Sequence, residues 1–311
     1  SMDEFSFIEY LKNNVAKSER VRVGIGDDAA VMSLSKGKQL VVSTDVIVEN
    51  VDFRIKYLSP EKIGRKALAI NLSDVAAMGA APTAFVICVG KPACITDAWL
   101  KRFYKGLGVL AKQYHVACVG GDFSKSKEFF ASVTIFGEAS SHQIVKRSGA
   151  KAGDWIAVTG SLGGSILRRH YDFAPRVREG LFLSRGFSPT AMIDISDGLV
   201  QDLSHILKAS GVGACLDLGK IPVSSDAKTI AKGNYRKALD GALSDGEDFE
   251  LLFTLSPRQK RRLEKSWKKN FPGVPLSWIG KVEGKSSHLL WCRDGKRVAA
   301  PKLSQKGFSH F

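Results

Sequence analysis

Acidic residues follow apolar stretches at several points of this basic chain, beside glycine or other small residues. One such acid usually caps a helix or closes a turn. Several converging carboxylates would instead need cations, because burying unpaired charge is costly. Oxygen ligands with few histidines indicate a hard metal, most often Mg²⁺ bound together with nucleotide phosphates. The acids in question are Asp27, Asp28, Asp45, Asp74, Asp122, Asp194, Asp197, Glu247 and Asp248.

The stretch GIGDDAAV, residues 24–31, combines a glycine turn with two carboxylates. Glycine loops commonly bind phosphate through backbone N–H groups. Asp27 and Asp28 would repel a phosphate directly, so magnesium between the acids and the phosphate would resolve the conflict.

Other catalytic signatures are missing from the sequence. It contains neither a Walker A motif nor the HRD and DFG motifs of protein kinases, so nucleotide use would need a different scaffold. The turn TGSLGGS, residues 159–165, could touch phosphate, although packing is the commoner role of such a turn. None of the six histidines falls inside an acidic motif, and no Ser-His-Asp or Cys-His set is found.

The elements that must position these acids alternate between strands and helices. In the first half, a helix begins at Ser59 and Pro60 and stops at Gly79, and a second is capped by Thr96. Val- and Ile-rich segments predict strands within 21–34, 39–49, 83–90, 116–122 and 129–139.

A domain boundary is expected near RSGAKAGDW, residues 147–155, where the periodic pattern stops. A chain of 311 residues is long for one core, so we predict two domains, 2–146 and 147–311. In the second domain, segments 155–160, 214–223 and 249–256 are predicted strands, and residues 192–210 form a strand end that leads into a helix ending at Gly211.

Composition favours a soluble globular protein, with 44% hydrophobic and 25% charged residues. No apolar run reaches the roughly 18 residues that span a bilayer. The cysteines are Cys88, Cys94, Cys118, Cys215 and Cys292; they form no CxxC pair, and we expect buried free thiols in a reducing cytoplasm.

The net charge of +15 admits a basic nucleic-acid-binding protein as an alternative, but it also suits an anionic small substrate. The densest basic segment, 258–269, carries Leu263, Trp267 and Phe271 at helical spacing. One apolar stripe of this kind favours a surface helix that packs on its own core.

Eight motifs follow one another along the whole chain: GIGDDAAV, STDVIVENVDF, KALAINLSDVAAMGAAP, GGD, RSGAKAGDWIAVTG, IDISDGLVQDLSHI, SDGEDFELLF and KGFSHF. In this order and spacing they resemble the thiamine-monophosphate kinase family. The resemblance implies an α/β (α+β) protein with the two-domain fold of aminoimidazole ribonucleotide synthetase. Its N-terminal domain would form a dimeric β-barrel with helices outside, and its C-terminal domain would be α+β.

The resemblance also implies an activity and a set of site residues. The family transfers the γ-phosphate of ATP to thiamine monophosphate, as a cytoplasmic homodimer that needs Mg²⁺ and commonly K⁺. The matching metal positions are Asp28, Ser43, Thr44, Asp45, Asp74, Asp122, Asp194 and Asp197. We interpret the neighbouring Asp27 as a turn residue, or one that supports the ligands, rather than as a ligand itself. ATP contacts match Gly121, Asp122, Arg147, Ser196 and Tyr104, and substrate positions match Asp52, Glu247 and Phe308.

The chain departs from the family pattern at three places. Asp52 replaces a histidine that the family usually has, which alters a substrate contact. The family's GGED appears as DGED at 245–248, and the segment after Ser165 is short. A sister enzyme that shares the acidic ATP site is the second alternative. Selenophosphate synthetase is disfavoured because no cysteine lies in a glycine-rich N-terminal loop.

The expected mechanism is direct in-line transfer. An acceptor phosphate oxygen is already ionised near neutral pH, so no general base is required. Several magnesium ions would screen the repulsion between the two phosphates. We expect no phosphoenzyme, and neither nucleic acid nor a membrane as partner.

Overall fold

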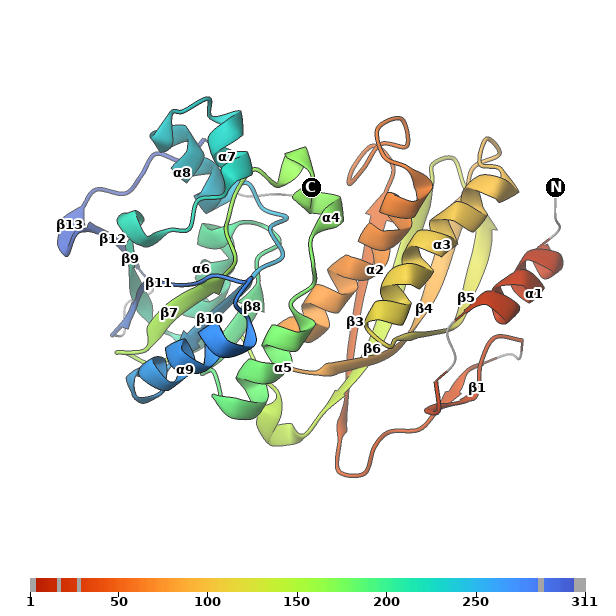
Figure 1. Cartoon of the computed structure of the whole chain (residues 1–311), viewed down its shortest axis with the longest axis horizontal. Coiled ribbons are helices and arrows are strands. Elements are labelled where there is room, and N and C mark those ends of the chain that lie inside the picture. The colour runs from red at the N-terminus through yellow and green to blue at the C-terminus, as the bar shows by residue number, and fades with distance from the viewer. Residues whose placement is uncertain (1–3, 16–17, 27–28, 285–287, 305–311) are drawn as a thin grey trace. The chain divides into compact units, whose positions relative to one another are not determined.

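The computed structural model describes residues 4–15, 18–26, 29–284 and 288–304 (Figure 1). The chain divides into two compact units, residues 1–75 with 80–142, and residues 76–79 with 143–311. We describe each unit by itself, and the domain bounds predicted from the sequence stay a prediction. No helix in the described ranges is long and apolar enough to cross a membrane.

The first unit is built on a four-stranded sheet in the order β3-β6-β4-β5. Strand β4 runs parallel to β5 through a crossover that contains α3, and the other pairs are antiparallel. A separate pair, β1 and β2, is antiparallel. The elements are α1 Glu4–Asn14, β1 Val21–Val23, β2 Val31–Met32, β3 Gln39–Val48, α2 Pro60–Ala77, β4 Ala81–Lys91, α3 Asp97–Gln113, β5 Ala117–Lys125, β6 Phe130–Ala139 and the 3₁₀ turn Ser141–Gln143.

Helices α2 and α3 cover one face of this sheet (Figure 1). As predicted, Thr96 caps α3, and its hydroxyl accepts the N–H of Trp99 at 3.1 Å. The two helices touch through glycines. A Cβ on Gly64 would lie 2.0 Å from the carbonyl oxygen of Phe103, and a Cβ on Gly106 would lie 2.0 Å from that of Glu61. The backbones therefore approach closely because both positions lack side chains.

The second unit is built on a seven-stranded sheet in the order β13-β12-β9-β11-β7-β10-β8. Only the β12 and β9 pair is parallel among these described strands. Its strands are β7 Trp155–Thr159, β8 Ala191–Asp194, β9 Gly213–Asp217, β10 Leu251–Leu255, β11 Leu276–Glu283, β12 Leu289–Arg293 and β13 Lys296–Val298. Its helices are α4 Arg169–Asp172, α5 Val177–Gly186, α6 Leu199–Ser210, α7 Ser225–Ile230, α8 Tyr235–Ser244 and α9 Pro257–Asn270, with 3₁₀ turns Ser165–Leu167 and Leu218–Lys220.

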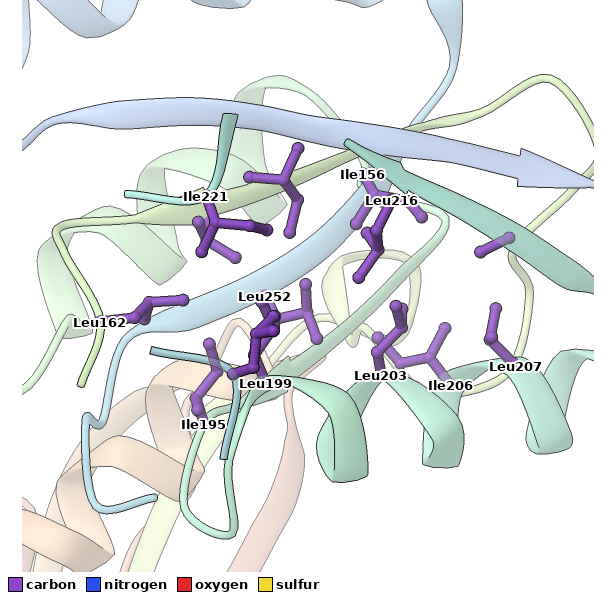
Figure 2. Close-up of a cluster of buried hydrophobic side chains, with 14 of the residues drawn as sticks. Ile156, Leu162, Ile195, Leu199, Leu203, Ile206, Leu207, Leu216, Ile221 and Leu252 are labelled. Atoms are coloured by element: carbon purple, nitrogen blue, oxygen red, sulfur yellow. The ribbon is translucent and has the colours of Figure 1, made fainter. Parts of the chain in front are cut away.

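The core of the second unit lies between this sheet and α6 (Figure 2). Leu199, Leu203 and Ile206 recur on one face of α6 and point toward Ile156 and Leu252 on the strands. The predicted end of this helix at Gly211 is confirmed by its left-handed backbone, with φ of 66°. The packing fixes the start of α6, which follows directly after the acidic motif IDISDG.

Helix α9 packs on its own unit. Leu263 and Trp267 are buried on it, and Phe271, which follows its last turn, is buried beside them. The indole N–H of Trp267 donates to the carbonyl of Val274 at 2.7 Å. The prediction that this basic segment is a surface helix on its own core is confirmed.

The cysteine prediction is only partly right. All five cysteines are free thiols, and Cys118 is buried. Cys88 and Cys94 are exposed, and Cys215 and Cys292 are half-buried. The apolar context of Cys88 misled the prediction, because alternate residues of a strand point to opposite faces.

Candidate functional site

The first unit brings three of the predicted metal ligands to one face. Residues 41, 43, 45 and 47 share a face of β3, and the outer two, Val41 and Ile47, are buried. The hydroxyl of Ser43 donates to the Asp74 carboxylate from α2. Asp45 lies on the same face of β3 as Ser43. This face therefore gathers half-buried oxygen ligands from a strand and a helix.

Thr44 and Asp122 turn away from that face. The Thr44 hydroxyl donates to the carbonyl of Val133 at 2.9 Å, on the opposite side of β3. Asp122 on β5 is exposed, and its carboxylate accepts the N–H of Phe123 at 2.9 Å. Because the ring of Phe123 contacts Phe7 on the helix side of the sheet, Asp122 points to the other side.

Two predicted ATP contacts have structural roles of their own. A Cβ at Gly121 would lie 2.1 Å from the carbonyl oxygen of Ile87, so the pairing of β5 with β4 requires glycine there. Tyr104 is only 7% exposed and packs edge-on against Phe7 and Phe103. Burial raises the pKa of Tyr104 well above its usual value, so its hydroxyl stays protonated.

The turn after β3 holds Asp52, the predicted substrate residue. Its carboxylate accepts the N–H of Val48 at 2.7 Å and closes the turn. Its backbone carbonyl accepts a hydrogen bond at 3.0 Å from the ammonium group of Lys66, a buried residue of α2. Asp52 is therefore part of the structure of this turn.

In the second unit, the acidic loop follows β8. Asp194 ends the strand and is buried, and Ser196 and Asp197 follow in the loop that leads into α6. Asp202, one turn into α6, is 2% exposed, and its Oδ2 atom faces this loop. Burial, and then the negative charges of Asp194 and Asp197, raise the pKa of Asp202 to about 8.

A second loop pairs with the first through the backbone. The N–H of Glu247 donates to the carbonyl of Ser196 at 2.7 Å, and the N–H of Phe249 donates to that of Ile195 at 2.8 Å. Glu247 and Phe249 both have positive φ angles, 53° and 49°. Non-glycine residues with such angles are uncommon, and surrounding contacts must hold them.

The glycine turn at 159–165 uses its N–H groups inside the protein. Gly163 donates to Asp248 at 2.9 Å, and Gly164 donates to Asp245 at 2.8 Å. Burial raises the pKa of Asp248 well above its usual value, against the opposing effect of nearby Arg169. These N–H groups therefore have carboxylate partners, which favours the packing role over phosphate binding.

Known proteins resemble this chain over its whole length. Residues 26–139 match the model described as AIR synthase related protein, N-terminal domain. A thiamine-monophosphate kinase from Rhodopirellula baltica is 40% identical over 319 residues, which cover 99% of this chain and 97% of the relative. The chain belongs to the thiamine-monophosphate kinase family.

Solved structures of thiamine-monophosphate kinases share the fold. That from Stenotrophomonas maltophilia has a TM-score of 0.83 at 32% identity, covering 96% of this chain and 98% of its own. Another, AaThiL complexed with AMPPCP and TMP, has a TM-score of 0.74 at 30% identity and covers 100% of this chain and 99% of its own. The predicted α/β class and the synthetase-like fold are confirmed.

Three positions that match thiamine-monophosphate kinases need separate mention. Asp28 and Phe308 lie outside the described residues, as does the neighbouring Asp27. Arg147 is exposed near the start of the second unit.

Sequence reasoning missed two residues of α6 that lie beside the acidic loop. Among the described residues, Asp197, Asp202 and His205 offer ligand atoms that all lie within 4.8 Å of one another. The sequence placed no histidine among the acids, and the structure puts His205 beside two of them. The signal was the spacing: residues 202 and 205 are three apart, which puts them on one side of the first turns of α6.

Proposed function

We propose that this chain transfers the γ-phosphate of ATP to thiamine monophosphate and releases thiamine diphosphate and ADP. The carrying observation is the match over almost the full length to a thiamine-monophosphate kinase. The oxygen cluster of Ser43, Asp45 and Asp74 supports it, because phosphoryl transfer from ATP generally depends on Mg²⁺. The relative named as a complex with AMPPCP and TMP supports both substrates.

Magnesium fits the side chains that the chain presents. The described cluster in the first unit offers a hydroxyl and carboxylates, which are hard oxygen ligands. In the second unit, Asp194 and Asp197 each raise the pKa of Asp202, so a cation would relieve their mutual repulsion. The proposed ligands are Asp28, Ser43, Thr44, Asp45, Asp74, Asp122, Asp194 and Asp197. A K⁺ requirement stays a prediction.

The proposed transfer is direct and in line. Bound magnesium would screen the charge between the donor and acceptor phosphates. The acceptor brings its own ionised oxygen, so the protein needs no base to remove a proton. The role left to the chain is to hold both phosphates in line, which the paired loops around Ser196 and Glu247 suit.

The remaining site residues are proposed by their match to family positions. ATP would contact Gly121, Asp122, Arg147, Ser196 and Tyr104, and the thiamine moiety would contact Asp52, Glu247 and Phe308. Exposure of Arg147 and Asp122 is compatible with a ligand contact. The burial of Tyr104 makes it the least accessible of the set. A cytoplasmic location and the absence of nucleic acid as a partner stay predictions.

We also propose a homodimer that forms through the sheet of the first unit, where a β-barrel shared by two copies would lie. Leu40, Val42 and Val46 on β3 are 48%, 52% and 48% exposed and share one face of the strand. An exposed apolar strand of this kind commonly marks an association surface. Val42→Glu should dissociate the dimer in sedimentation velocity, whereas Val109→Glu, on an exposed site of α3, should leave the mass unchanged.

The activity is tested by coupled measurement of ADP release, with and without thiamine monophosphate, over a range of Mg²⁺ concentrations. We expect release that depends on both. Asp74→Asn should abolish it, while Glu19→Gln, an exposed acid in the same unit, should not. ADP release that ignores thiamine monophosphate would refute the proposed acceptor. A phosphorylated aspartate or histidine trapped after one turnover would refute direct transfer.

A further inference from the structure

The side chain of Asp202 accepts hydrogen bonds from three successive backbone N–H groups. Its Oδ2 atom accepts from Ser196 at 3.0 Å, from Asp197 at 3.0 Å and from Gly198 at 3.1 Å. Asp202 is 2% exposed, so water does not compete for these hydrogen bonds. Hydrogen bonds to a buried acceptor are strengthened by the low dielectric of the protein interior. One buried oxygen therefore sets the path of the whole loop.

The loop held in this way carries the residues of the proposed site. Ser196 is the proposed ATP contact and Asp197 a proposed metal ligand. The carbonyl of Ser196 also accepts the N–H of Glu247, the proposed thiamine contact, at 2.7 Å. A change in the path of the loop would therefore move groups on both the ATP side and the thiamine side of the site.

Asp202 is anchored on a packed helix. Asp202 lies in α6, whose apolar face, including the adjacent Leu203, is buried in the core of the second unit (Figure 2). The side chain therefore links a packed helix to a loop, residues 196–198, that carries no apolar side chain. The last residue of the loop, Gly198, has a φ of 121°, a conformation that glycine adopts readily and few other residues do.

We propose that Asp202 is a positioning residue for phosphoryl transfer, acting as the shared acceptor that holds the Ser196–Gly198 loop against the loop of Glu247. The expected effect on kcat rests on the proposed function, whereas the three hydrogen bonds that hold the loop do not depend on it. Supporting groups of this kind typically contribute about 10-fold to 100-fold to activity or metal affinity. Asp202 would do so without touching either substrate.

The test compares Asp202→Ala, which removes the acceptor, with Asp202→Asn, which keeps an acceptor oxygen but cannot ionise. Asp154→Ala is the matched control. Asp154 is also buried, and its Oδ2 accepts the N–H of Lys151 at 2.9 Å in a turn that carries no proposed ligand. The measurements are kcat, KM for MgATP, the Mg²⁺ concentration for half-maximal rate, and hydrogen exchange of the amides of residues 196–198.

If Asp202 is a positioning residue, Asp202→Ala should lower kcat by about 10-fold to 100-fold and speed hydrogen exchange of the amides of residues 196–198. For Asp202→Asn, both kcat and the exchange rate should stay within a few-fold of wild type. Asp154→Ala should leave kcat unchanged even if it lowers Tm. A wild-type kcat and slow exchange in Asp202→Ala would overturn the proposal. So would an equal loss in Asp202→Asn together with a raised Mg²⁺ requirement, because that result would make Asp202 a metal ligand.

The test also covers a variant that does not fold and a wild-type protein that lacks the proposed activity. If Asp202→Ala fails to fold, the rate and Mg²⁺ requirement of Asp202→Asn still separate an acceptor from a ligand. If the wild-type protein does not phosphorylate thiamine monophosphate, the proposed function fails. Exchange at 196–198 and calorimetric binding of AMPPCP with Mg²⁺ still compare Asp202→Asn with wild type. Fast exchange of these amides in the wild-type protein would itself refute the three hydrogen bonds.

Discussion

Arg176 and Glu250 form a bidentate ion pair, in which Nε and Nη2 of the guanidinium donate to the two carboxylate oxygens at 2.7 Å and 2.8 Å. The Thr159 hydroxyl donates to the same carboxylate at 2.6 Å. Glu250 is buried, and it directly follows the loop of Glu247. This paired arginine therefore supports the start of strand β10, next to the loop of the proposed thiamine contact.

Removing Arg176 should lower the stability of the fold, because the buried carboxylate of Glu250 would lose its main ion-pair partner. We expect Arg176→Ala to lower the free energy of unfolding by about 3 to 5 kcal/mol, and Arg176→Lys to lower it less. Urea unfolding measures both. Arg185→Ala, at an exposed site on α5, should stay within about 0.5 kcal/mol of wild type. A loss as small as that in Arg176→Ala would show that the pair contributes little.

Asp248 should make stability fall as pH rises. Its folded pKa is raised by burial, so between the unfolded pKa near 3.9 and the folded pKa the folded state holds more protons. The favourable contribution is complete below the unfolded pKa and is lost above it, by at most about 1.4 kcal/mol for each pH unit. Asp248→Asn keeps an oxygen for Gly163 and removes this titration.

The variant should therefore gain stability relative to wild type between pH 5 and pH 8. Urea unfolding at both pH values measures the difference. If the difference in free energy of unfolding between the two proteins were the same at both pH values, Asp248 would titrate at its ordinary pKa in the folded state.

The contact between α2 and α3 should not tolerate a methyl group at Gly106. The added carbon would lie 2.0 Å from the carbonyl oxygen of Glu61, so a helix must shift. We expect Gly106→Ala to cost about 1 to 3 kcal/mol or more. Gly108→Ala, two residues along α3 with open space around it, should instead stabilise by up to about 1 kcal/mol. Thermal unfolding of the two variants should shift Tm in opposite directions.

The cysteines should differ in reactivity. Burial raises the pKa of the Cys118 thiol to about 12, so it carries almost no thiolate at pH 8. Cys94 is exposed. Iodoacetamide at pH 8 should therefore modify Cys94 in the folded protein and leave Cys118 unmodified, as peptide mass spectrometry would report. Equal modification of both in a protein that remains folded would contradict the burial of Cys118.

The sequence alone was enough for the class of protein and for most of its elements. Local signals decided these features: Thr96 as a cap, Gly211 as a stop, and the apolar stripe of Leu263 and Trp267 on α9. The order of the eight motifs was enough for the family. Each of these depends on residues that are neighbours along the chain, or on a pattern that can be counted there.

The tertiary structure alone decided which polar groups meet. Gly163 and Asp248 are 85 residues apart in sequence, and they bond because β7 and β10 pair in one register. Strand pairing and alternation likewise put Ser43 on the face of Asp74 and Thr44 on the other. The sequence predicted Asp197 as a site residue. Only the packed position of α6 brings the Asp202 side chain to the three backbone N–H groups that donate to it. Hydrogen-bond partners of this kind depend on distances across the fold, which local residue patterns do not contain.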